Sequence, residues 1–292
     1  MPAAARRTSS KPRAVAASSA AKTAVKNAAI SRVAAVAHSS FAATEVGSGV
    51  PQDPLRQPLR EEPNASGCYH CPTATCECVV FGDALDDALD RVDLRRVTEV
   101  TNNISLCAKS LNPCFVARLA HLLDVQDDDT FYDLGCGNGS ILFQMAFITG
   151  ARCVGVEISK HNAELARRTW EILRPELERI AKRPMPEVTI ITGDLAHLVM
   201  EPEFAGPRPL KILTSNLLLP RSLTHFMSER FRKLARGSRI ACFDDLYPHG
   251  RLSCRTRDPE AFELFHMTDC VWPQLSVEWC AAEGPFYIHT RV

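Results

Sequence analysis

The segment FYDLGCGNGS, residues 131–140, is the feature that most restricts the fold of this chain. An apolar run that ends in an acid is followed by glycine at three alternate positions and then by the apolar segment Ile141–Thr149. A glycine-rich turn between a strand and a helix lets the backbone approach a ligand and directs free N–H groups toward it. The segment therefore predicts a strand, a ligand-binding loop and a helix of an α/β domain.

The glycine spacing separates two classes of ligand. A dinucleotide fingerprint, G-x-G-x-x-G, would need its third glycine at the position of Ser140. Here the glycines are Gly135, Gly137 and Gly139, and Asp133 precedes them. An acid is unfavourable beside a pyrophosphate, but it suits a ligand with a cationic sulfonium and an amino group. The loop therefore favours S-adenosyl-L-methionine, and it argues against a nicotinamide-dependent oxidoreductase.

Two further acids follow the next two predicted strands. Glu157 ends VGVEIS, where a carboxylate can accept hydrogen bonds from ribose hydroxyls, and Asp194 follows in ITGDL, where it can accept from an adenine amino group. Each acid alone could instead be a solvated residue that caps the next helix. Three acids at successive strand ends, on the edge where open α/β sheets bind ligands, predict a cofactor site.

From about residue 112, apolar strands alternate with amphipathic helices, which is typical of βαβ units and a parallel sheet. The helix after the second strand contains Pro175, which is expected to kink or break it. At the end of the chain, LSVEWC, the turn AAEG and PFYIHT predict an antiparallel hairpin. Strands are expected at residues 130–134, 152–158, 188–195, 210–219 and 238–246.

The net charge of zero over 292 residues hides an asymmetry. Residues 1–44 contain seven Lys and Arg and no Asp or Glu, which leaves 27 basic and 34 acidic residues in the remainder. This composition, with the Gly/Pro-rich sequence that follows, predicts disorder over residues 1–67. A nucleic-acid-binding or nuclear-import arm, a mitochondrial presequence and a solvated tail all fit it.

Twelve cysteines, the absence of a secretory signal and the absence of a membrane-length apolar run predict free thiols in a reducing compartment. Cys68, Cys71, Cys76 and Cys78 are clustered in CYHCPTATCEC. C-x-x-C followed by C-x-C could ligate zinc through thiolates. The pairs are closer together than in common zinc modules, so we interpret these residues as free thiols and assign no metal ligand.

Four segments resemble the disruptor-of-telomeric-silencing family of histone-lysine methyltransferases, a family without a SET domain. These segments are residues 127–160, LTSNLLLP, FMSERFRKLARGSRI and LSVEWCAAEGPFYIHT. The resemblance implies an α/β, Rossmann-like seven-strand methyltransferase fold at residues 112–292. A segment with the cysteine cluster at 68–111 and the basic arm and linker at 1–67 would precede it. The resemblance also implies a nuclear chromatin regulator that methylates a lysine in the globular core of histone H3 on nucleosomes. The basic arm would bind DNA.

The resemblance also implies roles for individual residues. Asn216 would stand between the cofactor and a lysine channel, with Trp279 and Phe286 in the channel wall beside Leu217 and Leu218. An alternative is that Trp279 and Phe286 are ordinary hairpin core. The implied S-adenosyl-L-methionine-binding residues are Asp133, Gly135, Gly137, Asn138, Ser140, Glu157, Asp194, Leu195 and Asn216.

The chain departs from the family pattern at three places. It has Ser215, Asn216 and Leu217 where the family shows Asn-Asn-Phe, and Phe286 where the family shows tyrosine. The segment SLNP, Ser110–Pro113, stands where the family carries Tyr-Gly-Glu-Thr, so a carboxylate that grips the cofactor is missing. These departures leave open a methyltransferase that acts on another protein lysine, or a catalytically weak chromatin-binding module.

Overall fold

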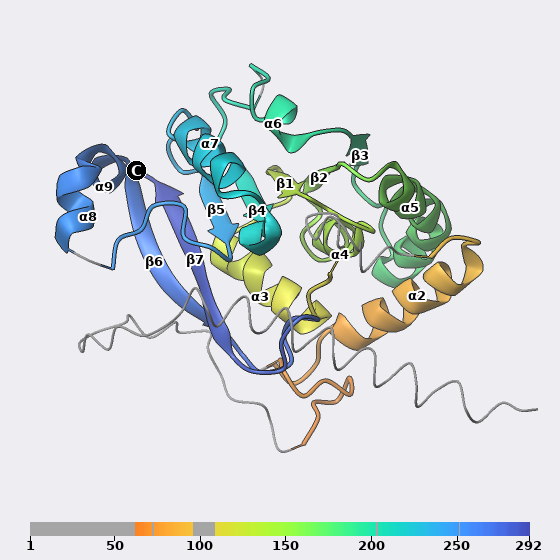
Figure 1. Cartoon of the computed structure of the whole chain (residues 1–292). Coiled ribbons are helices and arrows are strands. Elements are labelled where there is room, and N and C mark those ends of the chain that lie inside the picture. The colour runs from red at the N-terminus through yellow and green to blue at the C-terminus, as the bar shows by residue number, and fades with distance from the viewer. Residues whose placement is uncertain (1–61, 72, 96–108, 203, 251) are drawn as a thin grey trace, which may run out of the picture. The chain divides into compact units, whose positions relative to one another are not determined.

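The computed structural model describes residues 62–71, 73–95, 109–202, 204–250 and 252–292. Most of the predicted arm at residues 1–67 therefore lies outside the described residues. A seven-stranded sheet with the order β3-β2-β1-β4-β5-β7-β6 forms the centre of the fold (Figure 1). This order, parallel through the first five strands and antiparallel at the last two, confirms the predicted Rossmann-like methyltransferase fold.

The parallel part of the sheet follows the predicted strands closely. β1 pairs with β2 on one side and with β4 on the other. β3 then pairs with β2, and β5 pairs with β4. The predicted strand at 210–219 is shorter than expected, because the chain turns into the 3-10 helix Asn216–Leu218 directly after it. The parallel strands are β1 Thr130–Leu134, β2 Arg152–Glu157, β3 Val188–Thr192, β4 Lys211–Thr214 and β5 Arg239–Cys242.

The antiparallel hairpin is present, but its first strand is not the predicted one. β6, Phe265–Trp272, pairs with β7, Gly284–Arg291, over their whole length. The predicted strand LSVEWC lies instead in the connection between them, where Val277 makes only isolated bridges. Tight packing fixes the observed register, since a Cβ atom on Gly284 would lie 2.2 Å from the Trp272 ring.

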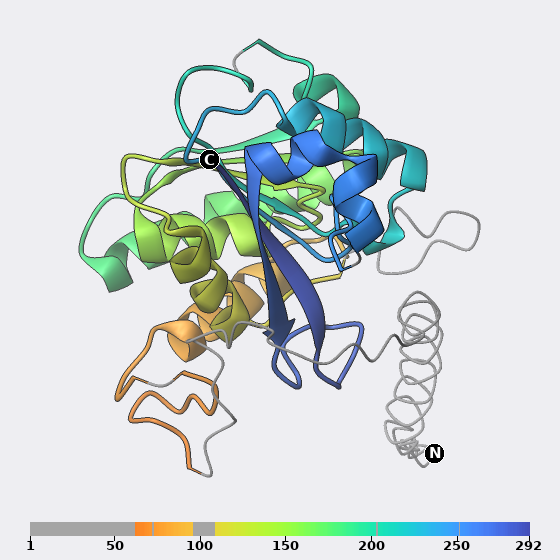
Figure 2. The same ribbon diagram turned by 90° about the vertical axis from the view of Figure 1, so that its left-hand side faces the viewer.

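Helices cover both faces of the sheet (Figures 1 and 2). α3, α4 and α5 lie on one face, and α6 and α7 lie on the other. α2 packs outside the first layer, against α5 and α3. Their bounds are α2 Cys78–Arg91, α3 Pro113–Leu123, α4 Ser140–Thr149, α5 Lys160–Ala181, α6 Leu195–Leu198 and α7 Arg221–Phe231, with the short α8 Leu252–Arg257 and α9 Pro259–Leu264 near β6.

Of the kink or break expected at Pro175, the break does not occur, because α5 runs through this residue without ending. Leu173 and Leu177 are buried on either side of this proline, and Trp170 stacks on Phe143 of α4 with ring centroids 5.1 Å apart. Pro175 itself is exposed, so the carbonyl that loses its intrahelical partner can be hydrated. Packing on the buried face therefore outweighs the local cost of the proline.

α4 is apolar on nearly all sides, and eight of its ten residues are buried. Such a helix is stable only between other elements, and here α3, α5 and the sheet surround it. Its ten residues are far fewer than a bilayer requires. Within the part of the chain that the structure describes, no helix has both the length and the apolar character needed to cross a membrane.

The contact between α4 and β2 depends on Gly155. A Cβ atom at this position would lie 2.3 Å from Leu142 Cδ1 and 2.7 Å from Cys136 Sγ. Gly155→Ala is therefore expected to lower the free energy of unfolding by about 1–3 kcal/mol, measured by urea denaturation. The matched control is Gly193→Ala, whose Cβ meets no atom within 4 Å and should change stability by less than about 0.5 kcal/mol. Equal stability of the two variants would contradict this packing.

Candidate functional site

The glycine loop between β1 and α4 adopts the left-handed backbone that its sequence predicts. Gly135, Gly137 and Gly139 have φ angles of 100°, 56° and 80°. The amide groups of Gly135 and Cys136 both donate to the carbonyl oxygen of Val156 at 3.0 Å, which fastens the loop to β2. A Cβ atom on Gly135 would meet no atom within 4 Å, so open space lies against the backbone there.

Asp133 lies in β1 directly before this loop, and only 1% of its surface is exposed. Neither carboxylate oxygen has a hydrogen-bond partner among the residues that the structure describes. Burial, with a smaller contribution from the charge of Glu157, raises the pKa of Asp133 to about 7. A buried carboxylate without a partner is costly to ionise, and a cationic ligand group beside it would offset that cost.

Glu157, at the end of β2, is also buried, but both of its carboxylate oxygens are used. Oε2 accepts from the backbone N–H of Gly137, and Oε1 accepts from that of Ser159, each at 2.8 Å. Burial raises the pKa of Glu157, and the two backbone hydrogen bonds oppose that shift. Glu157 therefore stabilises the glycine loop, and each oxygen can still accept a further hydrogen bond.

Asp194, at the start of α6, is exposed and caps this helix. One of its oxygens accepts from the backbone N–H of Ala196 at 2.9 Å. This is the contact that the helix-cap interpretation of the sequence expects. The neighbouring Leu195 is buried in a core cluster that includes Val156 of β2.

Asn216 follows β4 and is almost fully buried. Its Oδ1 accepts from the backbone N–H groups of Phe243 and Asp244, at 3.0 and 2.9 Å, and its Nδ2 donates to the Asp244 carbonyl oxygen at 2.8 Å. The side chain thus joins the ends of β4 and β5. The family resemblance implies a place between cofactor and lysine, and the structure gives Asn216 a positioning contact with the loop after β5.

Trp279 and Phe286 belong to a cluster of aromatic rings around Phe243. The ring of Trp279 lies 5.2 Å from that of Phe243, and Phe286 lies 5.2 Å from Phe115 of α3. Phe286 is 1% exposed, which is the packing expected of hairpin core. Trp279 differs, because its buried indole N–H has no hydrogen-bond partner among the described residues. A buried donor of this kind marks a place where a polar ligand atom could be accommodated.

The segment that replaces the family signature lies directly beside the glycine loop, which sequence reasoning left open. The hydroxyl groups of Ser110 and Ser140 are 2.6 Å apart, and Gln144 Nε2 donates to the Pro113 carbonyl oxygen. The backbone N–H of Ser110 donates to Glu278 Oε2 at 2.8 Å, and the N–H of Glu278 donates back to the Ser110 carbonyl oxygen. A carboxylate from the SVEW motif, which the sequence analysis passed over, therefore stands beside this segment.

A second set of charged residues follows β5 and was not recognised in the sequence. Asp245 Oδ2 lies 3.0 Å from His249 Nδ1, and Asp269 Oδ1 lies 3.1 Å from His249 Nε2. Hydrogen bonds with these two carboxylates raise the pKa of His249 to about 10. The imidazolium therefore joins the loop after β5 to strand β6. The run DDLYPH carried the signal, but only the fold brings Asp269 to it.

Comparison with known proteins identifies relatives by sequence. The sequence pattern of the family described as "Histone methylation protein DOT1" matches residues 92–291. The chain is 27% identical over 178 residues to "Histone-lysine N-methyltransferase, H3 lysine-79 specific" of Drosophila melanogaster, and 26% identical over 204 residues to the protein of that description from Yarrowia lipolytica. These alignments cover 60% and 68% of the chain. The chain spans only 9% and 39% of the respective relatives.

Solved structures with a similar fold include an O-methyltransferase from Bacillus cereus in complex with S-adenosylhomocysteine. The two chains are 17% identical, the TM-score is 0.46, and the match covers 72% of this chain and 91% of the other. An RNA methyltransferase from Salinibacter ruber is 21% identical, with a TM-score of 0.38 and coverage of 61% and 90%.

The buried Asp133 carboxyl predicts a specific pH dependence of stability. Its pKa in the folded chain, about 7, lies above the usual 3.8, so the folded chain retains a proton that the unfolded chain has lost. Stability therefore falls as the pH rises from about 4 to about 7. Asp133→Asn should remove this loss, which amounts to at most about 4 kcal/mol. Urea unfolding at stepped pH without ligand measures it, and identical pH profiles for the two proteins would contradict the assignment.

Proposed function

Because the chain belongs to the DOT1 family of histone methylation proteins, we propose that it transfers a methyl group from S-adenosyl-L-methionine to a lysine of histone H3. The observation that carries the proposal is Asp133, a buried carboxylate without a hydrogen-bond partner among the described residues, next to a glycine loop with open space in front of it. The relatives' names specify H3 lysine-79, so the target is a lysine in the globular core of H3.

The residues around the loop fit this cofactor. Asp133, with Gly135, Gly137, Asn138 and Ser140 of the loop, would hold the methionine end, where a cationic group offsets the cost of the buried carboxylate. Glu157 would hold the ribose, and Asp194 with Leu195 the adenine. When bound, S-adenosyl-L-methionine would supply an electrophilic methyl group on a sulfonium.

Glu278 supplies the carboxylate that the missing family signature would otherwise provide. Its Oε2 accepts from the Ser110 backbone N–H, and the Ser110 hydroxyl lies 2.6 Å from that of Ser140 in the glycine loop. The pair Ser110 and Glu278 therefore connects the replacement segment to the loop that would hold the methionine end. This assignment accounts for how the chain retains a cofactor site without Tyr-Gly-Glu-Thr.

Besides a bound cofactor, methyl transfer requires a neutral lysine amine. Holding a lysine of pKa about 10.4 deprotonated at pH 7 costs about 4.6 kcal/mol. An apolar wall lowers the pKa of an entering lysine, so no dedicated general base is needed. Leu217 and Leu218, which are partly exposed after β4, and Trp279 are the wall residues, while Asn216 fixes the loop after β5 beside them. Phe286 supports the wall from the aromatic cluster.

The substrate is the nucleosome, and the chain acts in the nucleus. The remainder of the chain beyond residue 44 is mildly acidic, with 27 basic and 34 acidic residues, so it is poorly suited to DNA. The seven Lys and Arg of residues 1–44, which lie outside the described part of the structure, are the available phosphate contacts. The basic arm would therefore bind DNA while the rest of the chain acts on H3.

The cofactor assignment is tested by calorimetry followed by a transfer assay. The full chain should bind S-adenosyl-L-methionine, and Asp133→Asn should weaken binding at least about 10-fold through loss of a charge-assisted contact. Glu187→Gln is the matched control, since Glu187 forms an exposed ion pair with Arg152 at 3.3 Å away from the loop. Absence of binding by the unmodified chain would overturn the proposal.

The same proteins are then incubated with labelled cofactor and reconstituted nucleosomes or free histones, and the modified lysine is mapped by mass spectrometry. We expect label on H3 for the unmodified chain and for Glu187→Gln, and less label for Asp133→Asn at a subsaturating cofactor concentration. Cofactor binding without label on any histone would instead support a chromatin-binding module or another protein substrate.

The arm makes a separate prediction about substrate binding. Deletion of residues 1–44 should weaken nucleosome methylation and leave the affinity for S-adenosyl-L-methionine unchanged. If all seven charges contact phosphate, the logarithm of the nucleosome binding constant should fall with the logarithm of salt concentration at a slope of roughly −6, and the deletion should flatten it. Replacing the seven basic residues by glutamine in the full-length chain is the matched control for length. Equal activity of the deletion variant on nucleosomes would refute the role of the arm.

A further inference from the structure

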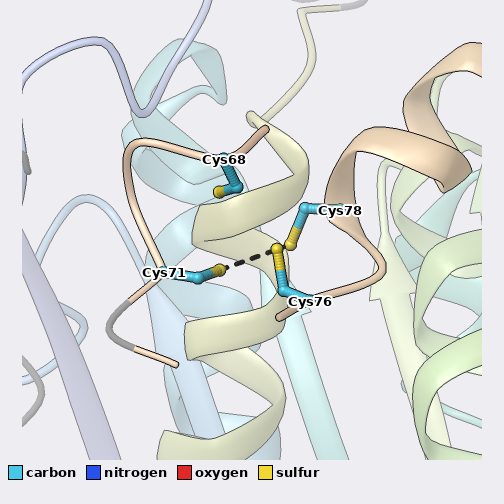
Figure 3. A group of neighbouring side chains, drawn as sticks. All are labelled: Cys68, Cys71, Cys76 and Cys78. Atoms are coloured by element: carbon cyan, nitrogen blue, oxygen red, sulfur yellow. Dashed lines mark hydrogen bonds between the residues drawn. The ribbon is translucent and has the colours of Figure 1, made fainter. Parts of the chain in front are cut away.

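Four cysteines near the start of the described chain have their sulfur atoms together. The Sγ atoms of Cys68, Cys71, Cys76 and Cys78 all lie within 4.8 Å of one another (Figure 3). Three of the four side chains are buried, and Cys76 is partly exposed. They come from a loop and from the first turn of α2, so two separate pieces of backbone converge on one point.

The loop is built to hold this arrangement. Asn64 Oδ1 accepts from the backbone N–H groups of Ser66 and Cys68, at 2.9 and 3.0 Å, and Gly67 takes the left-handed backbone, φ 80°, that closes the turn. Asn64 Nδ2 also donates to Cys76 Sγ at 3.4 Å. The buried Asn64 therefore orients both cysteine pairs.

Backbone and side-chain N–H groups surround the sulfur atoms. The backbone N–H of His70 donates to Cys68 Sγ at 3.4 Å, which adds a second N–H···S contact to that of Asn64. Cys78 is the first residue of the 14-residue α2, so the positive end of the helix dipole lies at its sulfur. N–H donors around the sulfur ligands are the usual second layer of a metal–thiolate site.

The sulfur distances fit a metal ion better than a disulfide. Zinc bound tetrahedrally by thiolates has Zn–S distances of about 2.3 Å, which places the sulfur atoms about 3.8 Å apart. The Cys71 and Cys78 sulfur atoms are 3.5 Å apart, and all four lie within 4.8 Å. A disulfide would need two sulfur atoms at about 2.05 Å, and the described cysteines are free.

We propose that Cys68, Cys71, Cys76 and Cys78 bind one zinc ion through four thiolates. Four protein ligands complete a tetrahedral site and leave no position for water or substrate, so the ion is structural. The short spacing between C-x-x-C and C-x-C, which favoured free thiols in the sequence, is no obstacle, because the Asn64 turn folds the first pair back onto the second.

The ion would fix the N-terminal segment to the body of the fold. Cys78 begins α2, which packs on α5, and its Phe81 stacks on Phe147 of α4 with centroids 5.9 Å apart. A fifth thiol, Cys114, is the second residue of α3, and its Sγ lies 3.1 Å from that of Cys68. Cys114 lies outside the group of four, and either sulfur of the Cys68–Cys114 contact could be the donor.

Metal analysis of the full chain tests the proposal without any measurement of activity. The chain, purified without a histidine tag or chelator, should contain one zinc ion per molecule by inductively coupled plasma mass spectrometry. Cys71→Ser should lose the zinc. Cys114→Ser, the neighbouring thiol, and Cys254→Ser, a thiol in α8, should retain it.

Because Cys71→Ser could fail to fold, a second measurement uses the unaltered chain. Exchange of zinc for Co²⁺ should give the absorption bands of tetrahedral thiolate coordination, and removal of the metal should lower the melting temperature. A chain without zinc, or one in which mass spectrometry finds a disulfide among these cysteines, would overturn the proposal. Retention of zinc by Cys71→Ser with its loss from Cys114→Ser would overturn this set of ligands.

Discussion

The parallel pairing of β1 with β2 and with β4 is the constraint on which the candidate site depends. In this register Asp133 lies opposite Gly155 and Leu213, so the three strands end at the same edge of the sheet. The chain leaves β1 toward β2 and β3 on one side, while β4 and β5 lie on the other. The direction of strand progression therefore reverses between β1 and β4. Open α/β sheets bind ligands in the crevice at such a reversal.

The polar groups at this edge divide into those that bind backbone groups and those without a partner among the described residues. Glu157 and Asn216 use their side chains on backbone groups of the glycine loop and of the loop after β5. Asp133 and the Trp279 indole have no such partners among the described residues. The hydrogen bonds of Glu157 and Asn216 hold the two loops in place. Burial of the Asp133 carboxyl and the Trp279 N–H costs free energy that a ligand can offset.

The positions of the acids and the glycine loop in this candidate site could be predicted because their signals are local. Asp133 and Glu157 lie at or near the ends of β1 and β2, Asp194 follows β3, and parallel strands necessarily bring their carboxyl ends to one edge. The contacts of Ser110 with Glu278, and of His249 with Asp269, join residues far apart in the sequence and left no local signal. The hairpin failed for a related reason. LSVEWC alternates like a strand, but β6 pairs with β7, and the Trp272 ring packs in the space that the missing Cβ of Gly284 leaves.

By itself, the sequence determined the α/β class, β1, the glycine loop and the acids at the strand ends, because periodicity and glycine spacing act over a few residues. It also carried the family resemblance that the match over residues 92–291 confirms. Tertiary structure alone decided that α5 continues through Pro175, that Phe286 lies under α3 and that four cysteine sulfurs meet at one point. These outcomes depend on packing and on turns between distant segments, whose energies no local pattern contains.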